Sequence, residues 1–85
     1  MKRDPVLLAR ILETIEAAPY DFSDIPIDLD LEGYSEDAVA YHVLLLSEAG
    51  LVTASSHGVS EDGRTRPRPI RLTWKGHEYL ARPTD

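Results

Sequence analysis

Residues 41–52 of this chain are Tyr41-His42-Val43-Leu44-Leu45-Leu46-Ser47-Glu48-Ala49-Gly50-Leu51-Val52, and this stretch decides the fold. Val39, Val43 and Leu46 recur at helical spacing, which predicts a stripe of buried side chains. Ser35 is a good N-cap, and Gly50 stands where the end of a helix favours a left-handed residue. The pattern therefore predicts a recognition-type helix over 35–49 that reverses directly into a strand.

Two more elements are predicted before that helix. A helix over 4–18 starts with Asp4 as N-cap and Pro5 in its first turn, and Pro19 ends it. Its expected core stripe, with Leu7 at the edge, consists of Leu8, Ile11, Leu12 and Ile15. Over 25–31, acidic residues and a proline alternate with four apolar residues, which are Ile25, Ile27, Leu29 and Leu31. Alternation with period two predicts a short edge strand there.

A hairpin and a last helix are predicted after Gly50. A strand begins at Leu51, and Asp62-Gly63 favours a tight turn. Pro67 and Pro69 make the return strand an edge strand until Ile70, from where it runs to Thr73, so that a wing covers 51–73. Thr73 is placed to cap a C-terminal helix over 74–82. We expect the large side chains of this helix to pack against the core, namely Trp74, Tyr79 and Leu80.

These elements predict a single α+β domain over 1–85, a winged helix with three helices, a small antiparallel sheet and a β-hairpin wing. The chain resembles a known family in four stretches, which are the one quoted above, Gly33-Tyr34-Ser35, Lys2-Arg3-Asp4 and the segment from Ile70 to Leu80. It resembles the uncharacterised family of small bacterial and phage proteins called domain of unknown function two-five-one-three. That resemblance covers nearly the whole chain outside the tip of the wing. It implies a winged helix and no established activity.

Charge is unevenly distributed along the chain, whose net charge is −6. Residues 21–50 contain eight carboxylates and no Lys or Arg, whereas the wing and the start of the last helix are basic. A basic wing can follow a phosphate backbone or enter a minor groove. We therefore interpret the chain as a transcription-regulator-like protein that contacts double-stranded DNA through Arg64, Arg66, Arg68, Arg71 and Lys75.

The helix over 35–49 favours a different function. Its side chains predicted to face solvent are Glu36, Asp37, Ala40, Leu44, Ser47 and Glu48, where a DNA reader would present basic or amide side chains. The segment over 25–31 also leaves little room for the positioning helix of a helix-turn-helix. The alternative hypothesis is thus an acidic protein-interaction module, one version being a phage-borne inhibitor or DNA mimic of a host protein. A homodimer is compatible with both hypotheses.

Several classes of protein are not expected. The chain has no cysteine, no His-Glu-x-x-His pattern, no Gly-x-Ser-x-Gly elbow and no glycine-rich phosphate loop, so we expect no metal, cofactor, small-molecule substrate or catalysis. The N-terminus lacks an apolar signal segment and no apolar run is long enough to span a bilayer, so a cytoplasmic protein is expected. His42 is interpreted as a core histidine bonded to a backbone carbonyl.

Overall fold

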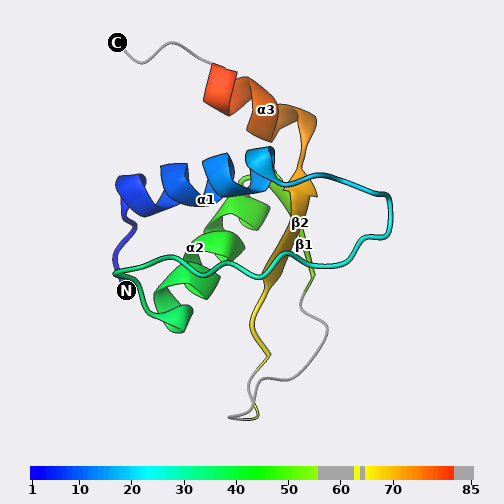
Figure 1. Cartoon of the computed structure of the whole chain (residues 1–85). Coiled ribbons are helices and arrows are strands. Elements are labelled where there is room, and N and C mark those ends of the chain that lie inside the picture. The colour runs from blue at the N-terminus through cyan, green and yellow to red at the C-terminus, as the bar shows by residue number, and fades with distance from the viewer. Residues whose placement is uncertain (56–62, 64, 82–85) are drawn as a thin grey trace.

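The computed structural model describes residues 1–55, 63 and 65–81. It contains, in order, α1 (Pro5–Ala17), α2 (Glu36–Glu48), β1 (Val52–Ser55), β2 (Arg68–Leu72) and α3 (Trp74–Ala81). The two strands pair antiparallel. Figure 1 shows α1 and α2 crossing beside the two strands, with α3 beyond the end of β2. The predicted α+β class, with three helices and a small antiparallel sheet, is confirmed.

Helix α1 is positioned by the cap that the sequence indicates. The carboxylate of Asp4 accepts hydrogen bonds from the backbone N–H groups of Val6 at 2.9 Å and Leu7 at 3.4 Å. The helix buries Leu7, Ile11, Leu12 and Ile15. Leu7 is thus a core residue and Leu8 is only partly buried, so the predicted stripe is wrong by one position. The four-residue spacing from Leu7 to Ile11 and Ile15 keeps one face of the helix on the core.

Helix α2 supplies the opposite side of the core. The Ser35 hydroxyl accepts a hydrogen bond from the backbone N–H of Ala38 at 3.1 Å, which caps the helix as predicted. Val39, Val43 and Leu46 are buried, in agreement with the predicted stripe. They join the buried residues of α1 and two strand residues, Val52 and Leu72, in one cluster. A single core therefore holds the two longer helices against one face of the hairpin.

Buried His42 ties the start of α1 to α2. Its side chain is 2 % exposed, and its Nδ1 lies 2.7 Å from the carbonyl oxygen of Ala38. Its Nε2 accepts a hydrogen bond from the backbone N–H of Asp4 at 2.8 Å. Nδ1 must then be the protonated nitrogen, since a carbonyl can only accept. The interpretation of His42 as a core histidine bonded to a backbone carbonyl is confirmed.

The strand predicted over 25–31 is wrong. This segment is extended but forms no strand, and the backbone N–H of Ile27 donates to the carbonyl of Pro69 in the sheet at 2.7 Å. A ladder needs N–H groups on both partners, and both Pro26 and Pro69 lack one. The alternation nevertheless has a structural basis, because Ile27, Leu29 and Leu31 pack against the core. Figure 1 shows the long path from α1 to α2 that passes the strands.

The predicted wing contains the hairpin of β1 and β2, while residues 56–62 and 64 lie outside the described part of the chain. The pairing register shifts between Thr53 and Ala54, which face Arg71 and Pro69 respectively. Ile70 is therefore the extra residue of a bulge. In a regular strand, residues three apart lie on opposite faces. The bulge instead lets Pro69 and Leu72 both face the core.

The turn after α2 and the start of α3 pack closely together. Gly50 has a φ of +77°, as expected for the end of a helix. The hydroxyl of Thr73 donates to the carbonyl of Gly50, and it accepts a hydrogen bond from the N–H of Gly76 at 3.1 Å, which caps α3. A Cβ on Gly76 would lie 2.1 Å from the carbonyl oxygen of Leu51. Only glycine allows this approach of α3 to the hairpin.

The expected packing of the aromatic residues of α3 is wrong. Trp74 is 80 % exposed and Tyr79 is 51 % exposed, while Leu80 alone of the three packs against the core. The helix has eight residues and contacts its neighbours through one face. Because buried Gly76 occupies the centre of that face, the large side chains on the other faces remain in solvent.

Replacement of Gly76 by alanine is expected to lower the free energy of unfolding by about 1–3 kcal/mol, because the new Cβ collides with a backbone oxygen rather than a flexible side chain. On helix propensity alone, the same change would stabilise α3 by about 1 kcal/mol. Urea denaturation followed by circular dichroism measures the difference. The matched control is Lys75→Ala on the exposed side of α3, and a Gly76→Ala variant as stable as that control would contradict the close packing.

Replacement of His42 by leucine is expected to lower the free energy of unfolding by about 1–3 kcal/mol, since it leaves the partly buried N–H of Asp4 without an acceptor. His42→Gln can still donate and accept, so it should lose less than the leucine variant. Thermal unfolding of the two variants provides the comparison. Equal stability of both would mean that the bridge between α1 and α2 adds nothing beyond the packing of the side chain.

Candidate interaction surface

The residues predicted for protein interaction lie along one side of α2. Glu36, Asp37 and Glu48 are exposed, and Leu44 is 43 % exposed. Ala40 and Ser47 are half-buried at the edge of the same surface. Helix α2 contains no Lys or Arg. The first turn places two carboxylates at the positive end of the helix dipole, where they also stabilise the helix.

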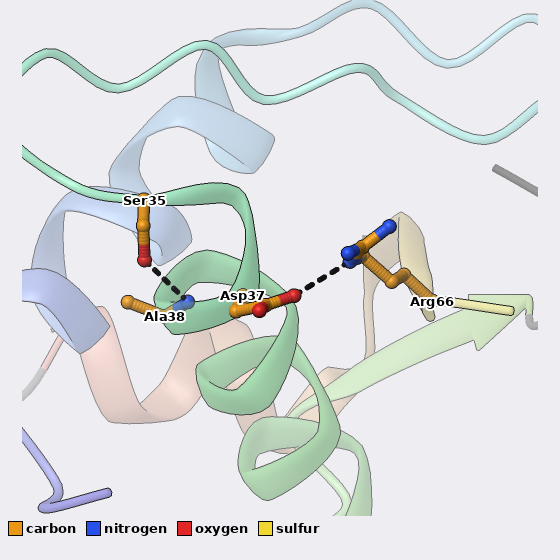
Figure 2. Close-up of polar contacts among 4 residues, drawn as sticks. All are labelled: Ser35, Asp37, Ala38 and Arg66. Carbon is orange, nitrogen blue, oxygen red and sulfur yellow. Dashed lines mark hydrogen bonds and ion pairs between the residues drawn. The ribbon is translucent and has the colours of Figure 1, made fainter. Parts of the chain in front are cut away.

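Two of the predicted wing arginines, Arg66 and Arg68, pair with carboxylates of α2 and of the segment before it. Arg66 Nε donates to Asp37 Oδ1 at 2.8 Å, and Figure 2 shows this ion pair beside the Ser35 cap of α2. Arg68 Nη1 lies 3.3 Å from Asp28 Oδ1 in the segment before α2. The side chain of Arg66 is 17 % exposed and that of Arg68 is 52 % exposed. Arg66 and Arg68, from the predicted DNA-binding site, therefore lie on the same surface as Asp37, from the predicted protein-interaction site.

The remaining basic residues of the predicted site do not join this surface. Arg71 is exposed, donates to the carbonyl of Leu72 at 3.3 Å, and lies near Tyr20. Lys75 is exposed on α3 beside the turn at Gly50. Arg64 lies outside the described residues. The described residues of the predicted basic site are thus divided between the two ends of β2, with Arg66 and Arg68 at its start and Arg71 and Lys75 at its end and in α3.

A notch separates α2 from the base of the wing. It encloses about 120 Å³ between α2, the segment around Ile27 and the residues before β2. The side chains at its bottom are apolar and include Val39, Val43 and Pro69, while charged groups of both signs surround its opening, namely Asp28, Glu36, Arg66 and Arg68. This notch was not predicted from the sequence. The signal available for it is the pair of prolines before and in the return strand, Pro67 and Pro69, which both line it.

The turn that follows α1 has its own polar network. The hydroxyl of Tyr20 donates to the carboxylate of Asp24, and this hydrogen bond raises the pKa of Tyr20, an effect that nearby Arg71 opposes. The carboxylate of Asp21 accepts from the hydroxyl and the N–H of Ser23, which lowers the pKa of Asp21. Phe22 and Asp24 have positive φ angles of 66° and 56°. The network therefore holds a turn whose backbone is unfavourable for non-glycine residues.

Two further observations concern the described part of the chain. No helix there is long and apolar enough to cross a membrane. Residues 1–55, 63 and 65–81 contain no group of three His or carboxylate side chains arranged to hold a metal ion.

The fold and the surface define a small α+β domain in which three helices and a two-stranded hairpin present charged side chains of both signs around an apolar notch. The chain belongs to the family described as Hypothetical protein (DUF2513), whose model matches residues 2–85. No curated protein and no solved structure gives a significant match.

Replacement of Asp24 by asparagine is expected to lower the pKa of Tyr20 toward its ordinary value, because the carboxylate that accepts the phenol proton is removed. In the wild type, the bond stabilises the fold below the ordinary pKa of tyrosine and is lost as the pH rises through the raised pKa of Tyr20. A titration of the tyrosine ring signals by NMR measures the change. Asp30→Asn, on the same segment, is the control, and an unchanged titration in Asp24→Asn would contradict the assignment.

Proposed function

We propose that this domain is a protein-interaction module on a winged-helix scaffold, with the notch and the exposed side of α2 as its binding surface. The order of elements supports the scaffold: α1, an extended segment bonded to β2, α2, a hairpin and α3. Helix α2 occupies the place of a recognition helix. Residues 18–35, where a positioning helix would lie, form no helix.

The observation that supports protein binding is the notch itself. Its volume of about 120 Å³ is below the roughly 300–1,000 Å³ of small-molecule sites and suits one apolar side chain. Buried anchor side chains surrounded by polar groups are typical of protein interfaces. The carboxylates of Asp28 and Glu36 and the guanidinium groups of Arg66 and Arg68 can pair with charges around such an anchor. We propose no catalytic step, cofactor or small-molecule substrate for this surface.

The ion pairs weigh against ordinary DNA binding. If Arg66 and Arg68 contacted phosphates, the carboxylates of Asp37 and Asp28 beside them would be brought close to the duplex and would repel it. A basic protein partner would instead gain from the exposed carboxylates of α2. One version of the proposal is therefore a phage-borne inhibitor or DNA mimic, in which carboxylates take the place of phosphates.

A second candidate function is contact with double-stranded DNA through the wing. The observation that favours it is the bulge at Ile70, which gives Arg68 and Arg71 the same exposed face of the hairpin. Both residues could then contact phosphates together. DNA contact would depend on Arg68 and Arg71, whereas protein binding would depend on the notch and the exposed side of α2. Variants at these different positions therefore distinguish the two candidate functions.

Selection of binders from a random peptide library on the immobilised protein tests the proposal. Selected peptides are expected to need an apolar anchor residue and to lose at least tenfold in affinity for Ala40→Phe, which fills the notch, and for Leu44→Asp, on the same side of α2. Val6→Asp, at an exposed apolar position on α1, is the control and should bind as the wild type does. Fluorescence anisotropy of labelled peptides gives the affinities.

The same assay with a labelled generic duplex distinguishes the second candidate. DNA contact would be supported if the duplex binds at about 50 mM salt, binds much more weakly at about 200 mM, and no longer binds to Arg68→Ala and Arg71→Ala. That result would contradict the first proposal. Peptide affinities that are the same for Ala40→Phe, Leu44→Asp and Val6→Asp would also overturn it. Circular dichroism of each variant confirms that the fold is retained.

A further inference from the structure

A second and larger groove lies at the other end of β2. It encloses about 640 Å³ between the end of α1, the turn over 18–24, the end of β2 and the start of α3, and its lining includes Tyr20, Phe22, Arg71, Trp74 and His77. Figure 1 shows the segment after α1 leaving the helix close to the junction of β2 and α3. The groove shares no lining residue with the notch beside α2. An inference about it is therefore independent of the proposed function.

Large aromatic side chains stand in solvent at the edge of this groove. Phe22 is 84 % exposed and Trp74 is 80 % exposed, and Tyr20 beside them is 39 % exposed. Aromatic residues are enriched in protein interfaces, and apolar groups gathered on a surface indicate a binding site. Phe22 and Trp74 line the groove but are themselves mostly exposed, so they leave it open to solvent. A small ligand would therefore remain largely open to water, whereas ligand sites bury most of their ligand.

The backbone holds Phe22 in this exposed position. Its φ of +66° is unfavourable for a bulky residue. The turn is fixed by the bond from Tyr20 to Asp24, by the bonds of Ser23 to Asp21, and by an edge-to-face contact of the Tyr20 and Phe22 rings at 4.9 Å. Strained backbone that the surrounding structure maintains is concentrated at functional sites. The exposed position of Phe22 is thus fixed by the hydrogen bonds and the ring contact of this turn.

Charge at the groove selects the kind of partner. Glu16 and the carboxylate of Asp24 lie on or beside the lining, and Arg71 and His77 belong to it as well. A nucleic acid strand would meet the carboxylates, and a strongly basic or acidic protein would meet a like charge. A second copy of the same chain would bring both signs in the reverse order, so that carboxylates of one copy can face Arg71 of the other. The surface also has both a hollow and exposed side chains, which suits the self-complementary patch of a two-fold symmetric interface.

We propose that this groove is the interface of a symmetric homodimer, in which Trp74 and Phe22 of each copy insert into the groove of the other. The dimer buries the two most exposed large hydrophobic side chains of the described residues. It leaves the notch and the exposed side of α2 facing outward on both copies, so that each dimer presents two binding surfaces.

The only tryptophan of the chain is Trp74, so its fluorescence reports on this interface alone. On dilution from about 500 μM to about 0.5 μM, a range that covers weak and moderate dimers, the emission should shift to longer wavelength and acrylamide quenching should increase. Sedimentation equilibrium over the same range should show a mass that falls from two chains to one. A single chain at every concentration would overturn the proposal.

Two variants identify the surface. Trp74→Ala and Phe22→Gly should each weaken self-association at least tenfold. Phe22→Gly should also fold at least as stably as the wild-type monomer, because glycine accepts the positive φ at this position. That pair of results would not arise from a variant that merely unfolds.

Leu44→Asp, on α2, is the control and should dimerise as the wild type does. A dimer that persists in both groove variants, or that is lost in Leu44→Asp instead, would overturn the assignment of the interface. So would a chain that stays monomeric and shifts its Trp74 emission only when a labelled single-stranded oligonucleotide is added. Loss of peptide binding in Ala40→Phe with dimerisation intact would show that the two surfaces act separately.

Discussion

The approach of α3 to the corner between α2 and β1 is the constraint from which much of the architecture follows. At this corner the chain leaves α2 through the left-handed Gly50 and immediately begins the hairpin, and Gly76 packs against the carbonyl of Leu51 with no room for a side chain. Thr73 bonds to both sides of the contact. Since β2 leads directly into α3, this contact also sets where the hairpin ends and which side chains of α3 face solvent.

The features that could be predicted from the sequence depend on neighbours a few residues apart. The Asp4 and Ser35 caps, the stripe of Val39, Val43 and Leu46, and the turn at Gly50 are local, and the structure confirms them. The strand expected over 25–31 was wrong because pairing depends on a distant partner, β2, whose Pro69 has no N–H to donate. Trp74 was expected inside for its size, but Gly76 two residues later decides which face of α3 is buried.

The charges along the chain take on a different meaning once it is folded. The composition separates an acidic middle segment from a basic wing, which suggested two competing sites, yet Arg66 and Arg68 lie on Asp37 and Asp28. Much of the segregation in sequence thus serves to join the wing to α2 and to the segment before it. Surface ion pairs of this kind stabilise a fold only slightly, so their main effect is on which partners the surface can accept.

The connection between α1 and α2 has a consequence for how this family can diverge. Residues 18–35 contain no helix or strand, and the backbone bond of Ile27 to Pro69 attaches the middle of this segment to the sheet. The entropy of closing a loop rises only slowly with its length, so residues can be added on either side of that attachment at little cost. The 20–24 turn and the 28–32 stretch can therefore change in length separately, while the core stays the same as long as Leu29 and Leu31 remain packed against it.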